Sequence, residues 1–437
     1  MNKIVFALVP AIAAALNSGV ASSREKAQPF QCSSDYAVGI FSTDEALPNP
    51  SLIETTYDRS LFATRSLPND AGNIVTRCFD DDFDGKIDRT VDFLRTDQLI
   101  TGLTFDGEWL YTSSAEGIKA HRDRNSDGVA DQTKVILASS GPDPIQFLNT
   151  SSNRLSLGVD GFLYLRAGDD GLGKVVSADG SKIQVNAAAL LRVRTDGAHL
   201  SILHWGYQKS KFDPRDPQRA IAQIEDAQSI RVCNGELIAL DIDSTSISRY
   251  GLVSRTPSFQ TEGKTAILKA THIIDFDQDI DGNLFATVLT QSGSSIFKLE
   301  RIGKPPAENP PLAKMGNNAL CTLLESESAE IRLAAQTEIL RRDFPAIPKA
   351  EEIIENPAAT IDARATALQT LIRLHGRFAI PLVSSYAADP EIGPAAIAAL
   401  GSPDIAHRVN PHTFLSALKS PDPRMRFEAA DAMSRSS

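Results

Sequence analysis

The sequence predicts a multidomain protein in which an all-β propeller of six blades precedes an all-α solenoid of helical repeats. Residues 35–303 are short β-branched and aromatic runs separated by Asp-Gly or Asn-Gly pairs, which is typical of an all-β domain. One turn-plus-strand unit recurs along these residues. After a proline-rich break at residues 304–312, the apolar period of residues 313–437 changes to that of paired helices.

The recurring unit sets the predicted number of blades. A four-stranded blade uses about 45 to 50 residues, so residues 35–303 suffice for six blades. The longest interval between units, from Asp160 to Asn234, is expected to hold a degenerate blade or an insertion. The other intervals are close to one blade length, and the units are centred on Asp58, Asp106, Asp160, Asn234 and Asp281.

Two acidic turns, "DDDFDGKID" at residues 80–88 and "DRNSDGVAD" at residues 123–131, repeat at the same period. Oxygen-bearing side chains at positions 1, 3, 5 and 9 with glycine at position 6 are typical of the first part of a calcium loop. Position 12 is Val91 or Lys134 rather than glutamate, so a bidentate ligand must come from elsewhere or be absent. The predicted metal ligands are Asp80, Asp82, Asp84, Asp88, Asp123, Asn125, Asp127 and Asp131.

Other interpretations of acidic turns stay open at this point. A solvated Asp-Gly hairpin without an ion uses the same residue types, because tight turns favour Asp and Gly. The segment "DQDIDGN", with Asp277, Asp279 and Asp281, is a weaker third calcium candidate because it lacks an acid at position 9.

The N-terminal residues 1–21 are predicted to be a signal peptide. One lysine precedes the uncharged run of residues 4–16, and small residues end at Ala21. A signal peptide predicts export to the periplasm or the extracellular space. No later segment is long and apolar enough to span a membrane, so the mature chain is expected to be soluble. A net charge of -11 argues against nucleic-acid partners and is compatible with cations.

The order of these motifs, including "DDDFDGKIDRTVDF" and "AHRDRNSDGVADQTKVIL", resembles the bacterial family named for a membrane-bound dehydrogenase. That family is distantly similar to soluble glucose and sorbosone dehydrogenase propellers, and HEAT repeats commonly follow its propeller. The resemblance covers about residues 35–303 and implies pyrroloquinoline quinone (PQQ) as a candidate cofactor beside the calcium that the acidic turns predict. The chain departs from the family pattern: no histidine lies between His121 and His199, and no CxxCH haem motif occurs.

A catalytic base, if present, is expected in the long interval between Asp160 and Asn234. His204 with Asp213 is the candidate pair, and the alternative is that His204 is an ordinary blade residue.

Four helical pairs are predicted in residues 313–437. Arg332, Arg364, Gly393 and Arg426 take equivalent places in successive pairs, and the pairs resemble HEAT repeats. A concave solenoid face predicts a protein partner, while the propeller face is a candidate site for a carbohydrate or another small molecule.

Two functions follow from the sequence. The first is an exported calcium-binding module that binds or scaffolds other molecules. The alternative is an extracytoplasmic quinone-dependent sugar or alcohol dehydrogenase.

Overall fold

The computed structural model describes most of the chain after residue 29. The predicted signal peptide, most of the predicted linker and Asp213 lie outside the described residues. The described ranges are 30–43, 45–67, 72–140, 155–168, 171–205, 210–212, 221–223, 227–233, 236–241, 243–255, 258–303 and 311–435.

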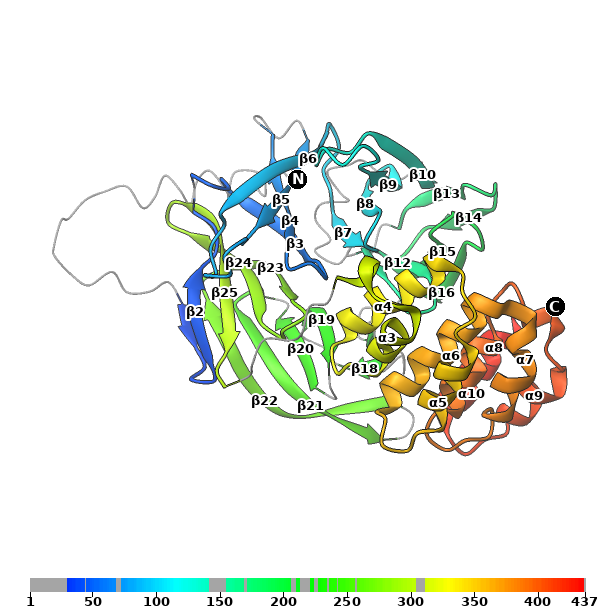
Figure 1. The fold of residues 1–437 in the computed structure, drawn as a ribbon. Coiled ribbons are helices and arrows are strands. Elements are labelled where there is room, and N and C mark those ends of the chain that lie inside the picture. Colours follow the sequence, from blue (N-terminus) through cyan, green and yellow to red (C-terminus); the bar gives the residue numbers. More distant parts are fainter. Residues whose placement is uncertain are drawn as a thin grey trace, which may run out of the picture.

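The β-rich part forms a propeller whose described strands make five sheets around a common centre (Figure 1). In every blade the first strand lies innermost, and each later strand pairs antiparallel with the one before it. The first blade is β3 (Pro50–Thr55), β4 (Leu61–Ser66), β5 (Asn73–Phe79) and β6 (Arg89–Thr96). The second is β7 (Gly102–Phe105), β8 (Leu110–Ser114), β9 (Gly117–Arg122) and β10 (Gln132–Ser139).

The remaining blades follow the same pattern. The third is β11 (Leu155–Leu157), β12 (Phe162–Ala167), β15 (Ala189–Arg194) and β16 (Ser201–Trp205). The fourth contains β19 (Ala227–Cys233), β20 (Glu236–Asp241), β21 (Ser246–Arg255) and β22 (Ser258–Ala270). The fifth is β23 (Ile273–Gln278), β24 (Leu284–Thr290), β25 (Gly293–Arg301) and the N-terminal β2 (Tyr36–Ile40).

The described residues thus form five blades where the sequence predicts six. The described strands of the long interval between Asp160 and Asn234 all belong to the sheets of neighbouring blades. The hairpin of β13 (Gly173–Ser177) and β14 (Lys182–Val185) extends the second blade beyond β10. β17 (Ser210–Phe212), β18 (Ile221–Gln223) and β1 (Phe30–Cys32) join the fourth blade at β22.

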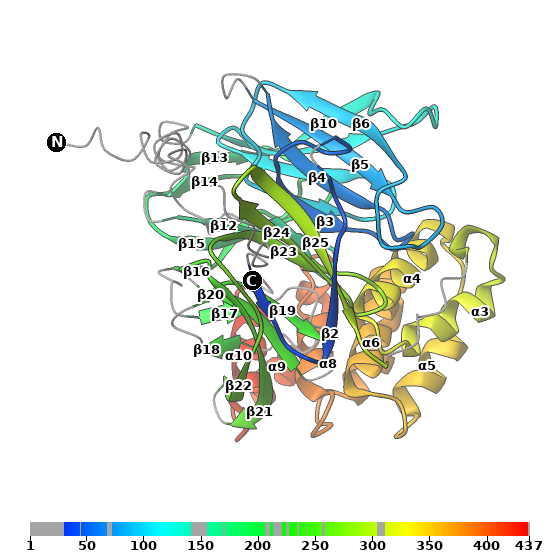
Figure 2. The ribbon, with the colours of Figure 1, turned by 90° about the vertical axis from the view of Figure 1, so that its left-hand side faces the viewer.

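The N-terminal strand β2 closes the ring. It pairs antiparallel with β25, with Tyr36 opposite Arg301 and Ile40 opposite Phe297, so the last blade takes its outer strand from the start of the chain (Figure 2). The backbone N–H of Phe41 continues this pairing by donating to the carbonyl of Ile296 at 2.9 Å. The last blade is therefore built from the start and the end of the propeller sequence.

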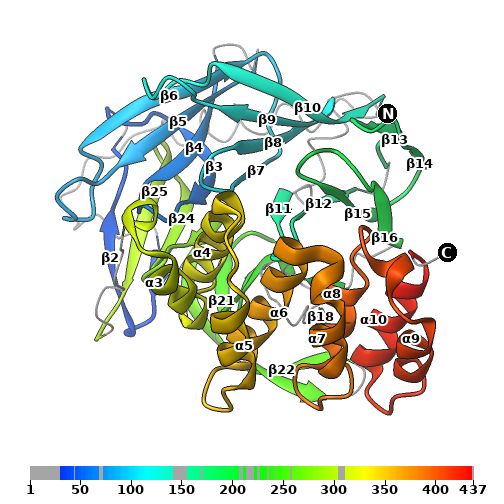
Figure 3. The ribbon, with the colours of Figure 1, turned by 45° about the vertical axis from the view of Figure 1, so that its right-hand side comes forward.

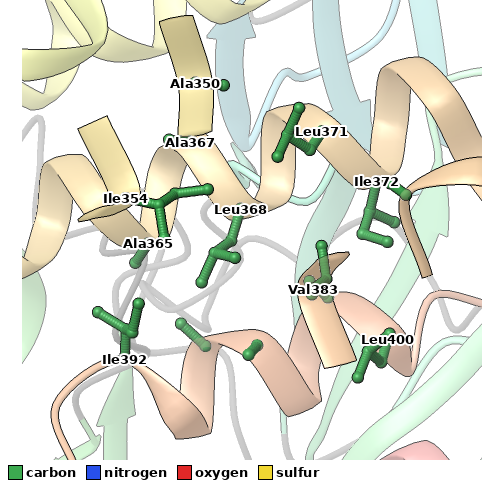
Figure 4. Close-up of a cluster of buried hydrophobic side chains, with 14 of the residues drawn as sticks. Ala350, Ile354, Ala365, Ala367, Leu368, Leu371, Ile372, Val383, Ile392 and Leu400 are labelled. Atoms are coloured by element: carbon green, nitrogen blue, oxygen red, sulfur yellow. The ribbon is translucent and has the colours of Figure 1, made fainter. Parts of the chain in front are cut away.

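The C-terminal part is helical and two-layered. Helices α4, α6, α8 and α10 follow one another in contact, and α3, α5, α7 and α9 pack outside them (Figure 3). A continuous apolar core joins the layers, from Ala350 and Ile354 through Leu368 to Leu400 (Figure 4). The helices are α3 (Asn317–Thr322), α4 (Ala329–Arg342), α5 (Ile347–Glu355), α6 (Ile361–His375), α7 (Ile380–Ser385), α8 (Gly393–Leu400), α9 (Pro411–Ala417) and α10 (Pro423–Met433).

Two of the equivalent arginines bind the turn that precedes their own helix. Arg332 donates to the carbonyls of Ser326 and Glu327 at 2.7 and 2.9 Å. Arg426 donates to the carbonyls of residues 420 and 421 at 2.7 and 2.8 Å. The sequence spacing therefore corresponds to a repeated structural role, since each guanidinium satisfies carbonyls that a turn leaves unpaired.

The inner helices lie on the propeller face that carries the turns between first and second strands. Leu333 of α4 belongs to the same buried apolar cluster as propeller residues of the second and third blades. Arg373 of α6 donates to the carbonyl of Val159 at 3.1 Å, and a Cβ on Gly161 would lie 2.7 Å from its guanidinium. Arg192 of β15 pairs with Asp431 of α10 at 3.0 Å. The helical part thus covers this face of the propeller.

Two further observations concern the predicted location and redox state of the chain. No helix in the described part is long and apolar enough to cross a membrane. Cys32, Cys78 and Cys321 are free thiols.

Candidate metal centre

The two acidic turns, loop 1 (residues 80–88) and loop 2 (residues 123–131), join the third and fourth strands of the first and second blades. Strands alternate in direction, so these turns emerge on the same propeller face as the turns between first and second strands. Positive φ angles at positions 4 and 6 make both turns tight. They are 62° and 85° at Phe83 and Gly85, and 62° and 90° at Ser126 and Gly128.

Both loops fold around the same hydrogen bonds. The carboxylate at position 1 accepts from the backbone N–H at position 6, at 3.0 Å in loop 1 and 2.8 Å in loop 2. Side chains at positions 3, 5 and 9 accept from the N–H groups at positions 5, 7 and 2 in both loops. In both loops the side chains at positions 1, 3, 5 and 9 thus accept backbone N–H groups of their own loop, and these are the positions that supply ligands in a calcium loop.

Position 8 of each loop connects two blades. The N–H of Ile87 donates to the carbonyl of Phe41 at 3.1 Å, next to the last blade, and the side chain of Ile87 packs on the cluster around Phe41. The N–H of Ala130 donates to the carbonyl of Phe93 of the first blade at 2.8 Å, and its side chain packs on the cluster around Phe93. The loops are therefore inter-blade contacts rather than free hairpins.

Loop 1 gathers its acids more closely than loop 2. One carboxylate oxygen each from Asp80, Asp82 and Asp88 lies within 4.8 Å of the others. Among the described residues, this is the one group of three or more acidic, histidine or cysteine side chains with that spacing. Asp84 points to a different partner, since its carboxylate binds the ammonium of Lys86 at 2.8 Å, which lowers its pKa.

Asp80 is the most informative ligand. It is only 9% exposed, and its Oδ1 atom has no hydrogen-bond partner. Burial raises the pKa of its carboxyl, and Asp84 and Asp88 add to this rise, while the ammonium of Lys298 opposes it. A buried carboxylate with an unsatisfied oxygen is costly unless a cation or donor compensates it.

Loop 2 offers a weaker ligand set. Position 3 is the neutral Asn125, whose amide donates to the carboxylate of Asp127 at 3.0 Å. Asp123 is less buried than Asp80, and both of its oxygens accept backbone N–H groups, from Ser126 and Gly128. Its acids are thus satisfied within the loop.

The third calcium candidate has structural partners instead. Asp277 is fully buried and accepts from Arg231 at 2.7 Å and from Thr55 at 2.9 Å. Asp281 pairs with Arg59 of the first blade at 2.9 Å. Burial raises the pKa of Asp279 to about 6. Asp277 and Asp281 thus join the last blade to the first through direct hydrogen bonds.

The predicted catalytic pair is placed only in part. His204 lies on β16 with its backbone opposite Leu190, and its side chain is outside the described part. Because Asp213 is also outside it, the pair stays a prediction from sequence.

A cavity of about 670 Å³ lies between the propeller face and α4. Sequence reasoning missed it, because its walls come from turns of the first two blades and from a helix that lies beyond the last blade in the chain. The propeller wall carries the ion pair of Asp58 with Arg77, and the helix wall carries that of Glu338 with Arg341. The other lining residues are Thr55, Thr56, Tyr57, Phe105, Asp106, Gly107, Glu108, Pro311, Leu312, Ala313, Lys314, Glu330, Leu333, Ala334 and Thr337.

Comparisons with known proteins give a family match over part of the chain and similar solved structures at low identity. Residues 22–211 match the family described as "Domain of unknown function (DUF7133)". No curated protein matches the chain.

Solved structures similar to this chain include glucose dehydrogenase-like, PQQ-type propellers at low identity. A calcium structure of a Trichoderma reesei enzyme of carbohydrate-active family AA12 is 14% identical, with a TM-score of 0.42, over 64% of this chain and 99% of that one. The PQQ domain of Coprinopsis cinerea pyranose dehydrogenase is 9% identical, with a TM-score of 0.39, over 64% and 98%. A glucose dehydrogenase is 11% identical, with a TM-score of 0.43, over 60% and 98%.

Proposed function

We propose that this chain is an exported, calcium-binding propeller with HEAT-like repeats that serves as a binding or scaffolding module. The observation that carries the calcium proposal is loop 1, where three carboxylates converge and a buried oxygen of Asp80 has no partner. Calcium takes oxygen ligands at about 2.3 to 2.6 Å, so ligand atoms within 4.8 Å of one another suit one ion.

The proposed ion has a structural role. Loop 1 and loop 2 each donate one backbone N–H to a neighbouring part of the ring, so an ion that fixes the loop also fixes that contact. An ion that binds only the folded state adds about 2.7 kcal/mol at a hundredfold excess over Kd. Incomplete loops are expected to bind at about 10⁻⁴ to 10⁻³ M, which suits extracellular calcium.

The cavity at the junction is the proposed site for a small polar ligand. Tyr57 and Phe105 supply aromatic surface, and the ion pairs of Asp58 and Glu338 supply acceptors and donors on opposite walls. Since the inner helices contact the propeller, we expect a protein partner to use the outer helices α3, α5, α7 and α9.

Thermal unfolding with calcium and with a chelator tests the proposal. We expect calcium to raise the melting temperature, and the double variant Asp82→Asn, Asp127→Asn to lose most of this shift. An unchanged melting temperature in the wild-type chain would reduce both loops to acidic turns.

The dehydrogenase alternative is tested separately. Purified protein with calcium, PQQ, an artificial electron acceptor and a panel of aldoses and alcohols should show no turnover if the chain is a binding module. Turnover that falls in His204→Ala would establish the alternative and its base.

A further inference from the structure

Loop 1 lies against the last blade at two charged residues of β25. A Cβ built on Gly85 would lie 3.7 Å from Oε1 of Glu300 and 3.8 Å from Nζ of Lys298. Both residues are on the strand that pairs with β2, with Lys298 opposite Gly39 and Glu300 opposite Ala37. The acidic loop therefore faces the strand pair that closes the ring.

A cation already connects the two blades here. The ammonium of Lys298 lies 3.0 Å from Glu300 and 3.8 Å from Asp80, and its side chain is 13% exposed. The contact with Asp80 is made to its Oδ2 atom, and Oδ1 has no hydrogen-bond partner. One monovalent group therefore serves an acid of each blade and satisfies Asp80 incompletely.

We propose that Glu300 is a further ligand of the loop 1 ion, so that calcium bridges the first and last blades and stabilises the contact at which the propeller ring closes. This inference rests on the proposed calcium binding. Glu300 would supply the carboxylate that position 12 of the loop lacks, because that position is Val91. Its ion pair with Lys298 holds it only weakly, since the Glu300 side chain is 53% exposed and such pairs contribute little.

Loop 2 has no such partner in the described structure. The residue that faces its glycine is Val91 of the first blade, whose Cγ1 would lie 3.0 Å from a Cβ on Gly128. A valine cannot ligate an ion, so the inter-blade ligand is specific to loop 1. The bridged interface is also the one that closes the ring, where Ile87 donates to the carbonyl of Phe41.

The test compares Glu300→Gln with a matched control, Glu116→Gln. Glu116 is 51% exposed and pairs with Lys119 at 2.8 Å, as Glu300 is 53% exposed and pairs with Lys298 at 3.0 Å, but it lies away from both loops. Calorimetric titration of the full chain with calcium should show affinity reduced by about tenfold or more in Glu300→Gln, because even partners behind the ligands change metal affinity by about 10- to 100-fold. Glu116→Gln should bind like the wild type.

Amide hydrogen exchange measures whether calcium stabilises the closure of the ring. Amides of β2 should exchange more slowly with calcium than with a chelator in the wild type and in Glu116→Gln, and calcium should lose this effect in Glu300→Gln. One outcome would contradict only the role of Glu300: calcium binds the wild type, Asp82→Asn weakens this binding, and Glu300→Gln changes neither the calcium affinity nor the exchange of the β2 amides. The calcium proposal itself would then stand. If the wild-type chain binds no calcium, both fail.

Discussion

Loop 1 and loop 2 differ in what surrounds them, although they have the same turn geometry and the same backbone hydrogen bonds. Loop 1 has an aspartate at each of positions 1, 3, 5 and 9, a buried Asp80 with an unpartnered oxygen, and the charged pair of Lys298 and Glu300 on the blade beside it. Loop 2 has an asparagine at position 3 and faces Val91. The difference teaches that, under the proposed function, the neighbouring blade as well as the loop itself decides which loop can hold an ion.

The largest expected difference between the two blades is in how their contribution to the free energy of unfolding depends on pH. His121 lies two residues before loop 2 and is 4% exposed, with Thr112 and Thr133 at 3.0 Å from its ring nitrogens. Burial, with a smaller contribution from the nearby Lys119 charge, lowers its pKa from 6.5 to about 4. The folded state therefore favours the neutral ring, and this stability is present above pH 6.5 and is lost as the pH falls towards 4.

The expected loss is about 3 kcal/mol, measured by urea unfolding between pH 7 and pH 4 in chelator. His121→Gln should remove this part of the pH dependence. The equivalent position before loop 1 is Cys78, whose pKa burial raises to about 12, so Cys78→Ala should leave the slope between those pH values unchanged. Equal slopes in wild type and His121→Gln would contradict the assignment.

Replacing the glycine at position 6 of each loop with alanine should show how closely the neighbouring blade packs against that loop. Both φ angles are positive, which costs a residue with Cβ about 1 to 2 kcal/mol. Gly128→Ala should cost more than Gly85→Ala, because its Cβ would be 3.0 Å from Val91 whereas that of Gly85 would be in ordinary contact at 3.7 Å. Urea unfolding in chelator measures both, and adding Val91→Ala to Gly128→Ala should recover part of the difference. An equal cost at the two sites would argue against this packing.

Val91→Glu should give loop 2 the carboxylate that Glu300 is proposed to give loop 1. The expected result is tighter calcium binding at loop 2, by a few-fold to about tenfold, since ligand charge sets the affinity of such loops. Calorimetric titration in an Asp82→Asn background isolates loop 2. Val91→Gln is the neutral control, and an equal gain in both variants would show that the carboxylate is not responsible.

The spacing of repeated motifs in the sequence predicted the propeller and the paired helices. The Asp-Gly units predicted the propeller, and of the four alternate acids of "DDDFDGKID" the structure brings Asp80, Asp82 and Asp88 together. Both follow from local rules, because a tight turn and the alternation of side chains along a strand depend on neighbours in the chain. The regular spacing of the equivalent arginines likewise predicted the helical pairs.

The features that the sequence did not predict depend on contacts between segments that are far apart in the chain. The described residues form five blades rather than the predicted six, because strands such as β13 and β14 extend an existing blade, and a strand carries no local signal of the sheet it joins. Glu300 and Asp80 lie in the last and first blades, far apart in the sequence, so only ring closure brings the two together. The docking of α4 onto the turns, and thus the cavity, has the same origin.

Exchanging position 3 between the loops tests the central claim, that loop 1 is the principal calcium site. Calcium titrations would be made on the wild type, Asp82→Asn and Asn125→Asp, substitutions that keep an oxygen acceptor for the N–H at position 5. Asp82→Asn should remove the tighter binding event and the calcium-dependent rise in melting temperature, whereas Asn125→Asp should leave that event intact and strengthen only the weaker one. If Asp82→Asn bound calcium as the wild type does, loop 1 would not be the site.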